Sequence, residues 1–333
     1  MVNSPPPDDA PAPTHRYSVH LLDPVVLGTL CGLASAIIYT AANSFLRSVK
    51  HCDPVWVSAI KAVPTVDCMA PWLLAMHSRG QRILPAWRIT FMIAAAGLFG
   101  QLVGNTSFQW ALGEVGVALT VPLSLGGMIV SAAILGRIFL HEPVTPRAAI
   151  SLGILLMAIC VLSLGAGDAR VSVVKTAATP LELAAGVAAG CLAGFAYSVL
   201  NVVIRYAVLR GMPLPTTLFI VATGGLVSLS AIAWTRIGPA GMIATKPQDL
   251  TLMLLAGACN TLAFLALTKS LQLTSVVYVN ALNATQAALA ALAGVLIFRE
   301  AFSPWLVQGV LLTILGLAIL TGSRPTLRPQ QPT

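Results

Sequence analysis

The chain is one structural unit written twice. Five residues at helical spacing near its start return 158 positions later: Gly28, Gly32, Tyr39, Asn43 and Arg47 recur as Gly186, Gly190, Tyr197, Asn201 and Arg205. The same shift carries Glu142 to Glu300 and Pro146 to Pro304, and a slightly smaller one carries Asn105 to Asn260. Each copy divides into five long apolar runs. Because five crossings is an odd number, the second copy must enter a bilayer from the opposite side, which predicts inverted repeats of the kind common in secondary transporters.

The composition places these runs in a membrane. Only 9% of the residues are charged and 57% are hydrophobic, which leaves too little polar surface for a soluble domain of this length. A helix needs roughly 20 apolar residues to cross about 30 Å of hydrocarbon. Ten runs meet this need: 24–46, 54–76, 89–111, 115–136, 147–166, 181–204, 215–235, 249–268, 274–297 and 304–322. Since they are continuous and not alternating, we predict an all-α integral membrane protein with ten transmembrane helices in two inverted five-helix repeats.

The domain boundaries follow from the same pattern. We predict repeats over 23–165 and 181–322, a linker over 166–180, and disordered proline-rich tails over 1–22 and 323–333. With the N-terminus inside, cytoplasmic segments hold eleven Lys and Arg residues against seven outside, so both termini are predicted to be cytoplasmic. The charge of +8 arises mostly from these loops and does not indicate a nucleic-acid partner.

Two stretches of each copy resemble a known family. AAGLFGQLVGNTSFQWAL and GRIFLHEPVTPRAAISLGILLMAICVLSLG in the first copy, with NTLAFLALTKSL and LIFREAFSPWLVQGVLLTILGLAIL in the second, are similar to EamA-type members of the drug/metabolite transporter superfamily. The resemblance implies a ten-helix basket around a central cavity. It also implies that the protein exports a small organic metabolite or drug across the inner (plasma) membrane. One departure is that SLGGMIVSAA and NATQAALAAL lack a proline that family members often carry there.

Polar residues at membrane depth are the candidates for a solute site, because they are costly unless they face protein or water. The Tyr39/Asn43 and Tyr197/Asn201 pairs either join helices by hydrogen bonds or act as symmetry-related gates. The other candidates are amides and a glycine pair expected to interrupt its helix: Gln101, Asn105, Gly126, Gly127, Asn260, Asn280, Asn283 and Gln286. Glycines 28, 32, 186 and 190 are expected to form close helix crossings.

The charged residues within or near the apolar runs have more than one possible role. Lys61 and Asp67 lie inside the second run. Lys61 either attracts an anionic solute group or anchors its helix, and Asp67 is either a proton carrier or a neutral structural carboxyl. Arg47 and Arg205 are expected to extend to the interface, and Glu142 and Glu300 to cap the helices that begin at Pro146 and Pro304.

The sequence therefore predicts a secondary transporter whose partners are a small-molecule solute and the lipid bilayer, with a homodimer left open. Nucleotide, catalytic and metal motifs are absent from it, so we predict no cofactor, no bound metal and no enzymatic activity. The alternatives are an antiporter of phosphorylated sugars or nucleotide sugars, which needs clustered basic residues, a lipid-handling membrane protein or membrane enzyme, and a passive channel.

Overall fold

The computed structural model describes residues 23–49, 51–84, 87–115, 117–168, 180–296 and 304–321. The regular elements of this part are all helices: α1 (Pro24–Ser48), α2 (Pro54–Ser78), α3 (Trp87–Phe99), the π-helix η1 (Gly100–Asn105), α4 (Thr106–Val115), α5 (Val117–Phe139), α6 (Pro146–Asp168), α7 (Pro180–Leu209), α8 (Leu214–Ile243), α9 (Pro247–Leu273), α10 (Val276–Asn283), α11 (Thr285–Leu296) and α12 (Pro304–Thr321). The predicted tails lie outside the described residues, and so does the predicted linker except for residues 166–168 and 180.

The helix starts follow from local sequence. Six of the helices begin at a proline, which suits the first turn because its missing N–H would have no partner there and its φ is already helical. The Asp53 carboxylate caps α2 by accepting from Val55 N at 2.9 Å and Trp56 N at 3.0 Å. The predicted starts at Pro146 and Pro304 are confirmed.

Six described helices are long and apolar enough to cross a membrane. They cover Pro24–Leu46, Pro54–Ser78, Trp87–Phe108, Ala184–Leu209, Leu214–Ile243 and Pro247–Leu273, and shorter apolar helices cover Leu123–Phe139, Pro146–Val161 and Val307–Thr321. The predicted gap between the runs 89–111 and 115–136 is wrong, because α4 stays helical through residues 112–114 to Val115. A single glycine within that stretch is not enough to end a helix.

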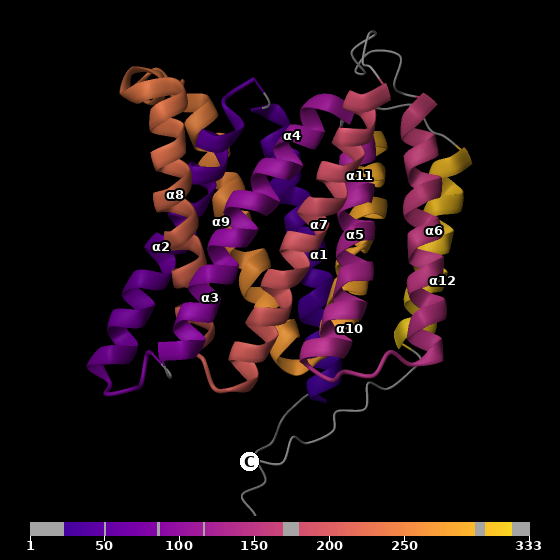
Figure 1. Ribbon diagram of the computed structural model, residues 1–333, viewed down its shortest axis with the longest axis horizontal. Helices are drawn as coiled ribbons and strands as arrows, with labels where there is room; N and C mark the ends of the chain where they lie inside the picture. Colours follow the sequence, from indigo (N-terminus) through magenta and orange to yellow (C-terminus); the bar gives the residue numbers. More distant parts are fainter. Residues whose placement is uncertain are drawn as a thin grey trace, which may run out of the picture.

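Equivalent helices of the two copies run in opposite directions. At the start of α2, Asp53 Oδ2 pairs with Arg236 Nε near the end of α8 at 3.1 Å, while Thr216 at the start of α8 donates to Ile83 O beyond the end of α2 at 2.8 Å. In the same way, Ser151 near the start of α6 donates to Gly316 O near the end of α12 at 2.7 Å. Figure 1 shows the helix pair α2 and α8 at one edge of the bundle and the pair α6 and α12 at the other, with α5 and α7 between them. The copies are therefore inverted.

Glycines bring helices of the two copies into close contact. A Cβ placed on Gly28 of α1 would lie 2.6 Å from Thr274 Cγ2, and Ser270 of α9 donates to Gly28 O at 2.7 Å. On α7, a Cβ at Gly194 would lie 2.2 Å from Ser124 O of α5. The predicted crossings are confirmed at Gly28, Gly32 and Gly190, where side chains of the neighbouring helix occupy the space that a Cβ would need.

Several irregular places interrupt the described helices, among them Gly238 of α8 (φ 65°, ψ 172°). The π-helix η1 separates α3 from α4, and a turn at Ala284 separates α10 from α11. The expected interruption at Gly126-Gly127 is wrong, because α5 is continuous from Val117 to Phe139. These glycines serve contact instead: a Cβ at Gly127 would lie 3.0 Å from Cys191 O on α7, and one at Gly126 would lie 3.3 Å from Leu156 Cδ2 on α6.

Candidate functional site

The π-helix η1 places two predicted site residues beside α7. Its wide turn carries Gln101 and Asn105, and the side-chain amide of Asn105 donates from Nδ2 to Oε1 of the Gln101 side chain. Tyr197 Oη on α7 donates to Asn105 Oδ1 at 2.7 Å. The approach is close because Gly104 faces the Tyr197 ring, where an added Cβ would lie 2.8 Å from Cε1. Single π-turns are frequent at functional sites, since they turn side chains out of the regular helical register.

A second polar contact joins α7 to α10. Asn201 Nδ2 donates to Asn280 Oδ1 at 2.7 Å and also faces Met128 Sδ of α5 at 3.9 Å. Asn201 is 6% exposed and Asn280 is fully buried. The Asn280 Nδ2 atom, however, is buried without a hydrogen-bond partner. An unpaired buried amide donor is costly, and such groups mark places where a ligand or water completes the bonding.

The amides at the break between α10 and α11 pair with each other. Gln286 Nε2 donates to Asn283 Oδ1 at 3.1 Å. Asn283 is 3% exposed and Gln286 is half-buried. Asn283 lies on the same short helix as Asn280, so the Asn283–Gln286 pair is close along the chain to the contact between α7 and α10. We call the following residues the polar cluster: Gln101, Asn105, Tyr197, Asn201, Asn280, Asn283 and Gln286.

The sequence equivalents on the other copy do not reproduce these contacts. Asn43, the equivalent of Asn201, is exposed, and Asn260, the equivalent of Asn105, is half-buried. Tyr39, the equivalent of Tyr197, is half-buried against the largest apolar cluster. Within the described residues, none of these three side chains makes a hydrogen bond, so the two-fold relation of the sequence is broken at the polar cluster.

Lys61 and Asp67 do not meet each other. Lys61 is half-buried on α2, whereas Asp67 is exposed. The buried stripe of α2 includes Ala62, Thr65 and Met69, and at 100° per residue Asp67 lies on nearly the opposite face. Neither Lys61 nor Asp67 has an ion pair in the described part of the chain.

A buried ion pair between the copies was not found by sequence reasoning. Arg205 Nε lies 3.0 Å from Glu142 Oε1, and the arginine is only 6% exposed. Arg205 Nη1 also donates to Leu271 O at 2.6 Å, and Glu142 Oε2 accepts from Val276 N at 2.9 Å. The expectation that Arg205 extends to the interface is therefore wrong. Glu142 caps a helix as expected, but it caps α10 of the other copy and not α6.

A signal for this pair existed in the sequence. Glu142 and Arg205 belong to the repeated set, and each recurs in the other copy. The side chains of their equivalents, Arg47 and Glu300, lie outside the described residues. Two repeated residues of opposite charge in a chain with so few charges point to an ion pair, although not to which copy supplies each partner.

Three groups able to bind a metal meet at the other end of the bundle, two from the loop between α1 and α2 and one from the first turn of α9. His51, Cys52 and Asp249 offer ligand atoms within 4.8 Å of one another, and His51 Nε2 lies 3.0 Å from Asp249 Oδ2. Burial and the Asp249 carboxylate raise the pKa of the Cys52 thiol, which Lys246 opposes. The contact between His51 and Asp249 already accounts for this arrangement.

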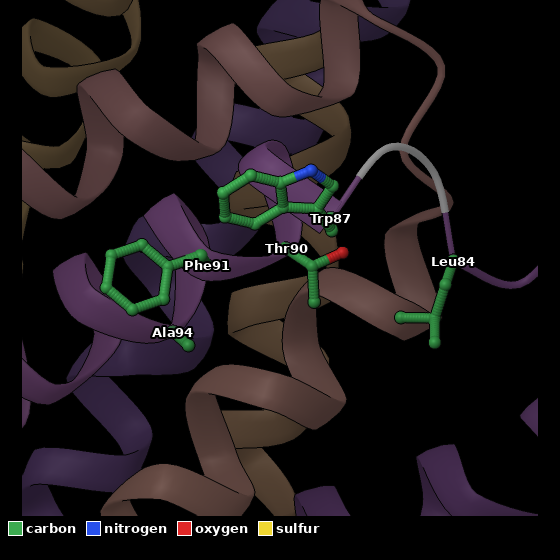
Figure 2. Close-up of a pocket in the computed structure, with 5 residues that line it drawn as sticks. All are labelled: Leu84, Trp87, Thr90, Phe91 and Ala94. Atoms are coloured by element: carbon green, nitrogen blue, oxygen red, sulfur yellow. The ribbon is translucent and has the colours of Figure 1, made fainter.

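Two cavities lie at the outside of the bundle and not at the polar cluster. Figure 2 shows the first, of about 430 Å³, lined by Trp87, Thr90, Phe91 and Ala94 of α3 with Leu84 from the segment before it. The second, of about 380 Å³, lies where α2 ends and α8 begins, beside Trp72 and Arg79. The predicted central cavity corresponds to neither of them.

These features define a class of protein: an integral membrane protein of inverted helical repeats with buried polar side chains along α7 and α10. A family model, the EamA-like transporter family, matches residues 26–164 and again residues 184–322. The chain belongs to this family, and it is a multi-pass membrane transporter of small molecules.

Two further comparisons bear on the fold and on relatives. A solved crystal structure, titled only as that of a protein, is similar with a TM-score of 0.69 and 19% sequence identity, covering 88% of this chain and 96% of that chain. At this identity the likeness concerns the fold alone. A search of curated proteins gives no match.

Proposed function

We propose that this transporter is a secondary carrier for a small polar solute that is uncharged or zwitterionic, and that the solute binds at the polar cluster. Binding would be followed by rearrangement of the two copies, so that the site faces each side of the membrane in turn. The proposal includes ten membrane crossings, cytoplasmic termini and export across the plasma membrane. The topology rests on the lysine and arginine count, and the direction on the family resemblance.

The observation that carries the proposal is the unequal environment of equivalent residues. Asn201 is buried and bonded to Asn280 at 2.7 Å, while its equivalent Asn43 is exposed. Tyr197 is bonded to Asn105, while Tyr39 makes no hydrogen bond within the described residues. An inverted-repeat carrier can have this property, because in its opposite state Tyr39 and Asn260, the equivalents of Tyr197 and Asn105, would form the bonded pair.

The chemistry of the polar cluster supports the solute class. Amides and a phenol offer both donors and acceptors without net charge. Arg205, the nearest cation along α7, already pairs with Glu142 at 3.0 Å. A phosphorylated solute usually needs several free arginines or lysines, which favours an uncharged or zwitterionic solute over the phosphorylated alternative.

The experiment begins with the purified protein and a metabolite library screened by thermal shift. A stabilising compound is then tested for saturable counterflow in proteoliposomes, where a carrier exchanges labelled for unlabelled solute and a channel does not. We expect Asn201→Ala, Asn283→Ala and Gln286→Ala to weaken binding at least tenfold. The matched control is Gln272→Ala, which removes an amide that only accepts from Lys269 Nζ. Unchanged affinity in all three cluster variants, or absence of counterflow with every stabilising compound, would reject the proposal.

A further inference from the structure

The helix α10 is a short helix that lies between an extended residue and a turn. It runs from Val276 to Asn283, and all eight of its residues are buried. Before it, Thr274 is extended (φ −136°, ψ 173°) and Ser275 caps the helix; after it comes the turn at Ala284. Ala284 keeps helical dihedral angles (φ −61°, ψ −19°), and its N–H donates to Asn280 O at 3.1 Å. The extended residue Thr274 is therefore the point at which α10 is able to tilt relative to α9.

The N-terminus of α10 is held by the buried ion pair. Glu142 places Oε1 on Arg205 Nε at 3.0 Å and Oε2 on Val276 N at 2.9 Å. A carboxylate at the first N–H of a helix also interacts favourably with its dipole. Arg205 additionally binds Leu271 O at the end of α9 at 2.6 Å. We call Arg205 and Glu142 the latch, since together they tie the segment between α5 and α6 to α7, α9 and α10 at one end of the bundle.

A second attachment holds α10 one turn further in. Asn280 follows Val276 by one turn of α10, and Asn201 precedes Arg205 by one turn of α7, and these two amides are bonded at 2.7 Å. The inner attachment belongs to the polar cluster and includes the unpaired Asn280 Nδ2. A solute that bonds to Asn201 Nδ2 or Asn280 Oδ1 therefore competes with the inner attachment. The latch and the contact between the Thr29 and Tyr278 hydroxyls, at 2.9 Å, then still hold α10.

We propose that α10 is the gate at the end of the bundle where α7 finishes, and that the latch keeps this gate closed. The inference rests on the proposed carrier function, which it deepens by naming the moving element and the residues that restrain it. Arg205 and Glu142 are positioning residues in this scheme, acting on the solute site through α10.

Hydrogen–deuterium exchange tests the gate without any solute. The full-length protein in lipid nanodiscs is compared with Glu142→Gln, which keeps the shape and an acceptor for Val276 N but removes the charge that holds Arg205. Opening of α10 then becomes easier, and the amides of residues 276–283 are expected to exchange at least about tenfold faster, since exchange reports local opening. The amides of α2 and α12 are expected to keep their wild-type rates.

The matched control is Asp53→Asn, which weakens the exposed Asp53–Arg236 pair at the opposite end of the bundle while an asparagine still caps α2. It is expected to leave α10 unchanged. If Glu142→Gln cannot be purified folded, Arg205→Lys replaces it: lysine keeps the charge but cannot reach Glu142 and Leu271 O together, and a smaller, local acceleration in α10 is expected. Wild-type exchange in α10, or equal acceleration in every helix, would overturn the latch. Because no solute is used, this result and the counterflow result can fail independently.

Discussion

Replacing Gly194 by alanine would put a methyl group into the backbone of a neighbouring helix. The added Cβ would lie 2.2 Å from Ser124 O and 2.7 Å from Met128 N of α5. Carbon makes its best contacts at about 3.5 Å, so the shortfall at Ser124 is roughly 1.3 Å. Both contacted atoms are backbone atoms, which cannot rotate away as a side chain would. The steric clash can therefore be removed only if α5 and α7 move apart.

The size of the effect follows from that separation. Overpacking typically costs about 1–3 kcal/mol when side chains share the strain. Separating two packed helices by about 0.5–1 Å also loses roughly a quarter to a half of the dispersion attraction between each pair of contacting atoms. We expect Gly194→Ala to lie at or above the upper limit, about 3 kcal/mol, which is roughly a hundredfold change in the unfolding equilibrium. The matched control is Gly153→Ala on the exposed face of α6, where nothing lies within 4 Å of the added Cβ; alanine there is expected to gain up to about 0.5–1 kcal/mol.

The assay is reversible unfolding of the purified protein in mixed micelles, followed by helical circular dichroism during titration with sodium dodecyl sulfate. The free energy of unfolding is compared for the wild type and the two variants. A Gly194→Ala protein within about 0.5 kcal/mol of the Gly153→Ala protein would show that α5 and α7 do not touch as closely as described.

Three further outcomes are expected. Tyr197→Phe removes the donor to Asn105 Oδ1 and should lower the free energy of unfolding by about 1–2 kcal/mol in the same titration; an unchanged value would contradict the bond. Because burial and Asp249 raise the pKa of the Cys52 thiol while Lys246 lowers it, less reactive thiolate is present near neutral pH. Asp249→Asn should therefore speed alkylation of Cys52, and Lys246→Gln should slow it, as measured by peptide mass spectrometry, with opposite signs counting against the assignment. Asp67→Asn should leave solute counterflow intact, because exchange requires no net proton movement and the carboxyl lies on the face of α2 opposite its buried stripe; loss of counterflow would give Asp67 a role in the site itself.

Much of the architecture was readable from the sequence because it depends on local properties. Hydrocarbon requires long apolar helices whose backbone bonds close internally, and prolines such as Pro54 and Pro146 mark helix starts through their own geometry. The inversion followed from an odd number of runs in each copy, and the structure agrees in the antiparallel contacts of α2 with α8. The repeat itself identified the stripe on which Tyr197 and Asn201 lie.

The partners of the polar residues were decided only by tertiary structure. Nothing near Arg205 in the sequence indicates that Glu142, 63 positions earlier, will bury its charge, or that the same carboxylate will cap α10. Asn43 and Asn201 occupy equivalent places in the repeat, yet one is exposed and the other is bonded to Asn280. Sequence sets what each helix can present, whereas the packing of distant segments sets which groups meet. Equivalent residues of an inverted repeat therefore need not have the same surroundings in one conformation.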